Sequence, residues 1–209
     1  MQHYYEGIGG WFSFREAFDA ILAGLPSDRP STVVELGTWE GKSTAYLGVR
    51  VVNSGLPVTL VAIDHFLGSP ELMGMAALPT LEATFRRHLA PVAEALGERF
   101  QVIVGDSAGS AARFADAYID AVWVDAAHEY EAVRADRAAW WPKVRAGGVW
   151  AVGVRVVGAG VEWAVSQVLL CHAGLLGAGL GPLCILFLLR GCKSGPLLGR
   201  HLVEHRLRH

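Results

Sequence analysis

Cysteine is scarce in this sequence, and its placement excludes two common uses of the residue. The three cysteines are Cys171, Cys184 and Cys192, all late in the chain, and no two of them form a C-x-x-C pair. An odd number without paired spacing argues against a disulfide framework and against a structural zinc site. We interpret these residues as reduced thiols.

Charged residues are also few, and no block of one sign occurs. They make up 18% of the chain, with a formal net charge of -2 at pH 7. Gripping a nucleic-acid backbone needs clustered lysine and arginine, so this balance argues against a nucleic-acid-binding protein. The amino-terminal stretch MQHYYEGIGGWF lacks the basic region and apolar run of a secretory signal, which predicts a cytoplasmic location.

Hydrophobic residues are abundant, at 52% of the chain, and they fall into alternating segments. Short apolar runs predict strands, and apolar residues three or four apart predict helices. The predicted strands are 32–36, 57–63, 100–104, 119–124 and 149–152, and the predicted helices are 11–25, 43–53, 81–97, 108–116 and 129–141. This alternation predicts an α/β, Rossmann-like fold with a mainly parallel central sheet and helices on both faces.

Acidic residues stand where four of the predicted strands end. They are Glu35, Asp64, Asp106 and Asp125. Ligands of open parallel sheets bind at the carboxyl ends of the strands. These four carboxylates are therefore expected to converge on one edge of the sheet and to form a binding site there.

The turn after the first strand carries two glycines, Gly37 and Gly41, in the stretch ELGTWEGKS. Glycines let a ligand lie against the backbone, and the helix that follows offers free N–H groups. The spacing fits neither the dinucleotide pattern G-x-G-x-x-G nor the phosphate loop G-x-x-x-x-G-K-[ST]. The carboxylate of Glu35, just before the turn, would also repel a phosphate, so both phosphate interpretations fail.

A ligand with a cationic end and a ribose matches these residues better. Glu35 favours a positive charge, and Asp64 can accept hydrogen bonds from two neighbouring ribose hydroxyls. Asp106 and Ser107, after the third strand, can bind an adenine amino group. S-adenosylmethionine has all three features.

The ordered set of motifs resembles a known family. It consists of E-x-G-x-x-x-G-x-S at 35–43, Asp64, the turn at 105–107, and D-x-x-H-x-Y at 125–130, followed by Asp136 and a glycine pair. This set is similar to the class I S-adenosylmethionine-dependent methyltransferases, and more narrowly to methyltransferase family 24, whose relatives include macrocin-type sugar O-methyltransferases. The resemblance covers roughly residues 30–152 and implies the class I methyltransferase fold.

The resemblance also implies a role for individual residues. The residues implied around the methionine part of the cofactor are Glu35, Gly37, Thr38, Gly41 and Ser43. Those implied at the ribose and adenine are Asp64, with His65 beside it, and Asp106 with Ser107. Asp125 and His128 would face the sulfonium and the methyl acceptor, with His128 as general base and Asp125 orienting it or binding a divalent cation.

The chain departs from the family pattern after the fifth strand. Relatives often carry one or two acids there, but this chain has Gly153 and Val154. Mg²⁺ is therefore only weakly supported as a second cofactor, and no metal ligand is assigned. Tyr4, Tyr5 and Trp11 could close over the cofactor as a lid, although packing of the first helix is the simpler interpretation.

The chain is divided into an N-terminal helical segment, 1–30, a cofactor-binding domain, 31–153, and an atypical apolar segment, 154–209. This last segment has two acidic and six basic residues, and 168–189 is uncharged. That run is as long as a membrane span, but five glycine and proline residues interrupt it. A helix with a strand pair that completes the sheet, a disordered or misassembled tail from an altered reading frame, and a membrane segment all remain open.

The expected function is O-methylation of a small hydroxylated metabolite or natural product. The alternative is a protein that binds S-adenosylmethionine or S-adenosylhomocysteine without turnover, its acceptor or metal site lost. The acidic balance and the absence of an N-P-P-Y-type loop count against a nucleic-acid methyltransferase. The expected partner is a small-molecule acceptor, with neither nucleic acid nor membrane, and the chain is a possible homo-oligomer.

Overall fold

The computed structural model describes residues 1–68, 78–127 and 130–153, and the backbone of several later strands. Five neighbouring strands pair in parallel in the spatial order β3-β2-β1-β4-β5. Their bounds are β1 Ser31–Leu36, β2 Val58–Asp64, β3 Phe100–Val104, β4 Ile119–Val124 and β5 Val144–Val152. The predicted α/β fold with a mainly parallel sheet is thus confirmed.

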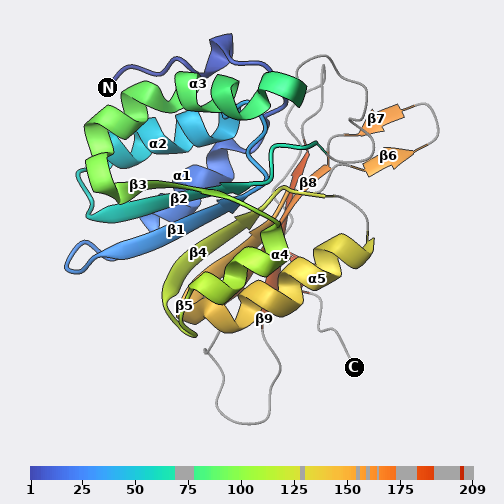
Figure 1. Ribbon diagram of the computed structural model, residues 1–209. Coiled ribbons are helices and arrows are strands. Elements are labelled where there is room, and N and C mark those ends of the chain that lie inside the picture. The colour runs from blue at the N-terminus through green and yellow to red at the C-terminus, as the bar shows by residue number, and fades with distance from the viewer. Residues whose placement is uncertain are drawn as a thin grey trace.

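Helices cover both faces of this sheet (Figure 1). On one face lie α1 Arg15–Ala23, α2 Lys42–Ser54 and α3 Leu81–Leu96, and on the other lie α4 Ser107–Ser110 and α5 Tyr130–Trp140. Short 3-10 turns connect them at η1 Tyr5–Gly7, η3 Leu78–Thr80, η4 Gly97–Arg99, η5 Ala111–Arg113 and η6 Trp141–Lys143. The predicted helix at 108–116 is therefore two shorter pieces, α4 and η5.

Alternate residues of each strand enter two separate hydrophobic clusters. Val33 packs with the α1–α3 layer, whereas Val34 and Leu36 pack with Trp140 of α5. Successive side chains of a strand point to opposite faces, so Glu35 shares the face of Val33. The strands are apolar on both sides because both sides are covered. This alternation turns the acid at the end of β1 toward α2.

The fifth strand starts earlier than predicted. A turn was expected at 145–148, but β5 runs from Val144 without a break. The register against β4 shifts there, since Ile119 pairs with Val144 and Ala121 with Val149. The extra residues form an irregularity in the strand, with Gly147 at a φ of 79°. The predicted turn at 145–148 is therefore wrong, and the glycines lie at an irregularity within β5.

Beyond residue 153 the structure describes only strands. They are β6 Val156–Gly158, β7 Val161–Trp163, β8 Val165–His172, β9 Leu183–Arg190 and β10 Val203–Glu204. Strand β8 pairs antiparallel with β5, and β9 pairs antiparallel with β8. Among the helices in the described ranges, none is long and apolar enough to cross a membrane. The division of the chain at residues 30 and 153 stays a prediction.

A buried charge network ties the strands together at the end of the sheet where β1, β4 and β5 begin. Asp120 is only 4% exposed and accepts a hydrogen bond from the Thr32 amide at 2.8 Å. Its other oxygen lies 2.7 Å from the Arg29 guanidinium and 3.2 Å from that of Arg145. Both arginines are partly exposed, so the buried carboxylate is the costly member of the network.

Replacement of Asp120 by alanine is expected to lower the free energy of unfolding by about 2–3 kcal/mol, because the buried Thr32 amide loses its acceptor. Urea denaturation measures this change. The matched control is Asp116→Ala, which removes the more exposed ion pair with Lys143 and should cost less than about 1 kcal/mol. Equal losses in the two variants would contradict the role given to Asp120.

Candidate functional site

The loop between β1 and α2, residues 37–41, is the centre of the candidate site. Gly37 has a φ of 78°, and a Cβ there would lie 2.3 Å from the carbonyl oxygen of Asp125. Gly41 has a φ of 90°, and a Cβ there would lie 2.2 Å from Leu89 of α3. Both positions therefore require glycine for internal packing as well as for backbone conformation. Close approach of a ligand was the expected reason and stays a prediction; packing against Asp125 and Leu89 is an additional reason.

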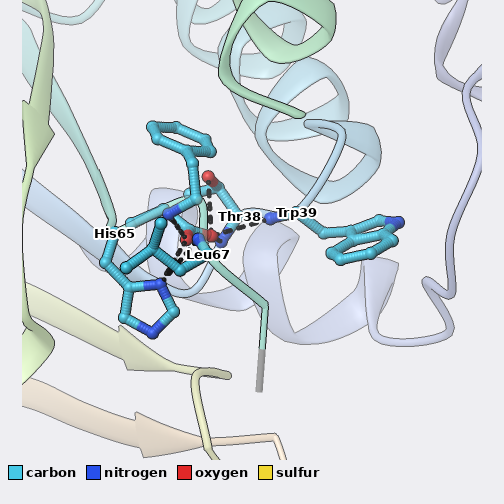
Figure 2. Close-up of polar contacts among 6 residues, drawn as sticks. Thr38, Trp39, His65 and Leu67 are labelled. Atoms are coloured by element: carbon cyan, nitrogen blue, oxygen red, sulfur yellow. Dashed lines mark hydrogen bonds and ion pairs between the residues drawn. The ribbon is translucent and has the colours of Figure 1, made fainter. Parts of the chain in front are cut away.

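The carboxylate of Asp64, the last residue of β2, holds this loop in place. One oxygen accepts hydrogen bonds from the backbone N–H of Thr38 at 2.7 Å and of Trp39 at 3.0 Å. The other accepts from the N–H of Phe66 at 2.7 Å. Figure 2 shows Thr38 and Trp39 directed toward these contacts, with Leu67 bonded to the ring of His65 beside them. Trp39 has a φ of 50°, a conformation that is rare outside glycine, and the carboxylate stabilises it.

These bonds limit what Asp64 can offer to a ribose. A carboxylate has about four acceptor positions, and the Thr38 hydroxyl, at 3.4 Å, also points to the oxygen shared by the two amides. The oxygen facing Phe66 keeps a free position, and the side chain is 12% exposed. In this arrangement Asp64 can accept one further hydrogen bond readily. Binding two ribose hydroxyls would require it to release part of the loop.

Helix α3 and the N-terminal segment also contact this loop and hold it in place. The Nδ1 atom of His88 lies 2.8 Å from the carbonyl oxygen of Glu40, so that nitrogen carries the proton. Lys42 donates a hydrogen bond to the carbonyl of Gly10 at 3.3 Å. A Cβ at Gly10 would lie 2.9 Å from the indole of Trp39. The loop is thus fixed on several sides before any ligand binds.

Glu35 lies beneath the loop and is fully buried. Burial is the main cause that raises the pKa of Glu35 to about 7, and the hydroxyls of Ser43 and Thr44 oppose it by favouring the charged form. The Asp64 carboxylate raises the pKa of Glu35 further. Neither carboxylate oxygen has a hydrogen-bond partner of good geometry. A buried acid in this state is a strong attractor for a nearby positive charge.

The turn after β3 presents Asp106 at the surface. Its carboxylate accepts a hydrogen bond from the N–H of Gly109 at 2.6 Å and caps helix α4. The carbonyl of Ser107 accepts a hydrogen bond from the indole N–H of Trp140 at 2.9 Å. The exposed face of Asp106 remains open to a ligand, and the amide of Gly105 bonds the carbonyl of Asp64 at 3.0 Å. The two acidic strand ends are therefore neighbours.

The end of β4 completes this edge of the sheet. The amide of Asp125 donates to the carbonyl of Leu36 at 2.8 Å, which places it beside the end of β1. A Cβ at Gly153 would lie 2.9 Å from a carboxylate oxygen of Asp125. The described residues contain no cluster of three or more metal-binding side chains, and Gly153 offers no ligand just after β5. No metal ligand is assigned among the described residues, and no step below uses a metal.

The structure brings together most of the residues that the sequence singled out. Glu35, Asp64, Asp106 and Asp125 all lie at the carboxyl edge, as their strand order requires. Thr38 and Ser43 are buried within the loop and the start of α2. His65 is exposed, and because its Nδ1 accepts a hydrogen bond from the Leu67 amide at 2.9 Å, the proton of the neutral ring lies on Nε2. The predicted general base, His128, lies outside the described residues.

Sequence reasoning missed the role of His88 in holding the loop. Its spacing from Phe85 and Leu89 marks a helix face, but nothing in the sequence indicates which turn that face contacts.

The three residues of the possible lid differ in their burial. Tyr5 is buried, and the Tyr4 hydroxyl donates to the carbonyl of His88 at 3.0 Å, so both pack in the interior layer. Trp11 is 54% exposed.

The clamped glycine loop, buried Glu35 and the neighbouring acidic strand ends thus lie together at the carboxyl edge of the parallel sheet. A family model for a methyltransferase domain, methyltransferase family 24, matches residues 34–153. This match covers more than half of the chain, which therefore belongs to this family of S-adenosylmethionine-dependent methyltransferases. No curated protein sequence matches the chain.

Solved structures share the fold at low sequence identity. The calicheamicin methyltransferase CalS11 is 17% identical, with a TM-score of 0.50 over 66% of this chain and 63% of its own. A protein from Corynebacterium glutamicum is 16% identical, with a TM-score of 0.50 over 70% of this chain and 60% of its own. The chain thus spans less than two thirds of the length of these proteins.

Replacement of Gly41 by alanine is expected to destabilise the fold by about 2–4 kcal/mol, because the new Cβ meets Leu89 and the backbone is left-handed. The matched control is Gly55→Ala, at a left-handed position with no atom within 4 Å. It should cost only about 1 kcal/mol, the conformational part alone. Thermal and urea unfolding measure both, and equal costs would show that α3 does not restrict position 41.

The stability of the fold is expected to fall as pH rises between pH 5 and pH 8. Within this window folded Glu35, with its pKa of about 7, holds a proton that the unfolded chain has already released. The loss should be about 2–3 kcal/mol and should disappear in Glu35→Gln, which has no proton to release. Urea unfolding of both proteins at the two pH values measures it. Parallel pH profiles for the two proteins would contradict the buried, proton-binding state of Glu35.

Proposed function

We propose that this chain binds S-adenosylmethionine and transfers its methyl group to a hydroxyl oxygen of a small metabolite or natural product. The observation that carries the proposal is the β1–α2 loop, which Asp64 holds in place beside the buried carboxylate of Glu35. A preformed loop lowers the entropy that a ligand must lose on binding. The family membership supplies the reaction class.

The residues present fit the proposed cofactor by their chemistry. The buried carboxylate of Glu35 suits the positively charged methionine end. The free acceptor position of Asp64 suits one ribose hydroxyl, and the surface carboxylate of Asp106 suits the adenine amino group. We assign Gly37, Thr38, Gly41 and Ser43 to the loop that surrounds the methionine part, and His65 to the ribose side.

When bound, S-adenosylmethionine supplies an electrophilic methyl group on a positively charged sulfur. The chain's own contribution is to hold the acceptor oxygen in line with that group and to remove its proton. Asp125, at the end of β4, lies next to the β1–α2 loop and is assigned to the reacting centre. His128 is assigned as the base that takes the acceptor proton, with Asp125 orienting it.

The hydroxyl acceptor is the finer part of the proposal. CalS11, which shares this fold, is a TDP-rhamnose 3'-O-methyltransferase of calicheamicin biosynthesis. By analogy we propose a small hydroxylated acceptor for this chain, with a role in natural-product biosynthesis, a cytoplasmic location and a possible homo-oligomeric state. The net charge of -2 favours such an acceptor over nucleic acid.

A second candidate function is cofactor binding without turnover. Gly153 favours it, because the position just after β5 lacks the acid that relatives often carry, and a Cβ there would contact Asp125. In this case the clamped loop and the acidic edge would still bind S-adenosylmethionine. The two candidates differ only in whether S-adenosylhomocysteine is produced.

Titration calorimetry with S-adenosylmethionine and S-adenosylhomocysteine tests the shared part of both candidates. We expect binding by the wild-type chain and a loss of about tenfold or more in Asp64→Ala, which loses the loop clamp and the proposed ribose acceptor. Asp116→Ala, which changes only an exposed acid, should bind as the wild type does. If neither ligand gave a heat of binding, both candidate functions would be contradicted.

Turnover then separates the two. Production of S-adenosylhomocysteine across a panel of hydroxylated metabolites, each with its deoxy analogue, is measured with and without Mg²⁺. Product with a hydroxylated acceptor and none with its deoxy analogue supports the methyltransferase. Binding without turnover on the whole panel supports the second candidate.

A further inference from the structure

Asp125, just after β4, lies between two glycines that follow other strands, Gly37 after β1 and Gly153 after β5. A Cβ at Gly37 would lie 2.3 Å from the backbone carbonyl oxygen of Asp125. A Cβ at Gly153 would lie 2.9 Å from the carboxylate oxygen Oδ1 of Asp125 and 3.2 Å from its Cγ. The first glycine thus leaves room for the backbone of Asp125, and the second leaves room for its carboxylate.

The backbone at Gly153 does not itself require glycine. Its φ is not positive, so other residues could adopt this conformation. Its amide donates to the carbonyl of Val124 at 2.8 Å, which fixes Gly153 beside the end of β4. The consequence of glycine at this position is therefore the space that it leaves for the Asp125 carboxylate.

The remaining wall of this space is the indole of Trp123, which is rigidly packed. Trp123 is fully buried, and the ring centroids of Phe14 and Phe18 each lie 4.9 Å from its own. A Cβ at Gly153 would lie 3.2 Å from Cζ2 of Trp123. Asp125 is only partly buried, and its carboxylate is the end of a rotatable side chain. A methyl group at position 153 should therefore displace this carboxylate and leave the fold intact.

We propose that Gly153 is a positioning residue: it leaves the space that holds the Asp125 carboxylate where it favours the positively charged sulfur of S-adenosylmethionine over the neutral sulfur of S-adenosylhomocysteine. The inference rests on the proposed function, which assigns Asp125 to the reacting centre. Opposite unit charges near a protein surface attract strongly enough to change an affinity by about tenfold or more. A carboxylate held at this position therefore favours the exchange of product for fresh cofactor.

The test is the ratio of the dissociation constants of S-adenosylhomocysteine and S-adenosylmethionine, measured by calorimetry on the full chain. The two ligands share their amino acid, ribose and adenine, so a change that weakens those contacts alone leaves the ratio unaltered. We expect Asp125→Asn, which removes the charge and keeps the shape, to lower the ratio about tenfold. Gly153→Ala should lower it about threefold to fivefold, because the displaced carboxylate keeps its charge. Adding Gly153→Ala to Asp125→Asn should lower it no further, because the displaced amide is neutral.

Gly109→Ala is the matched control, because a Cβ there would also meet a carboxylate oxygen, Oδ2 of Asp106, at 3.1 Å. Asp106 is assigned to the adenine that both ligands carry, so this variant should leave the ratio unchanged. If Gly153→Ala does not fold, Asp125→Glu replaces it. Its longer side chain moves the carboxylate out of the space beside Gly153 and should lower the ratio without removing the charge.

Two kinds of failure can be told apart. An equal loss of affinity for both ligands in Gly153→Ala, or a wild-type ratio in Asp125→Asn or in Asp125→Glu, would overturn the inference and leave the proposed function standing. A wild-type chain that binds neither ligand would overturn the proposed function itself.

Discussion

The candidate site depends on the hydrogen bonds that the Asp64 carboxylate accepts from backbone N–H groups. This carboxylate joins the end of β2 to the loop that follows β1, and it stabilises the left-handed backbone of Trp39. Around these bonds, α3 closes the loop through Leu89 and His88, and the end of β4 closes it at Gly37. These contacts hold the loop in place independently of any ligand.

The strand and helix pattern was predictable because both faces of the sheet are covered. Uninterrupted apolar runs gave the correct bounds for β3 and β4, and helical spacing gave those of α3 to within a residue. The start of β5 was missed, since the shift in register at Gly147 depends on pairing with β4 and leaves no periodic signal. The split of the predicted 108–116 helix into α4 and η5 likewise depends on tertiary contacts.

The convergence of the acidic residues at one edge was predictable from the sequence, whereas their packing and hydrogen bonds were not. Acidic residues at successive strand ends converge because parallel strands share one carboxyl edge. The sequence could not reveal that Gly41 is needed for contact with Leu89, that Glu35 is sealed from solvent, or that Asp64 is largely occupied by the backbone. Each of these depends on the distance between segments far apart in the chain, which residue type and spacing do not specify.

The burial of Glu35 couples ligand charge to proton exchange with the solvent. At neutral pH this carboxyl group is partly protonated, so a cation that settles beside it would expel the remaining proton. The measured heat of such a binding event would then include the heat of protonating the buffer. Titrations in phosphate and in Tris would give different apparent enthalpies for the same complex, and their difference would count the protons released.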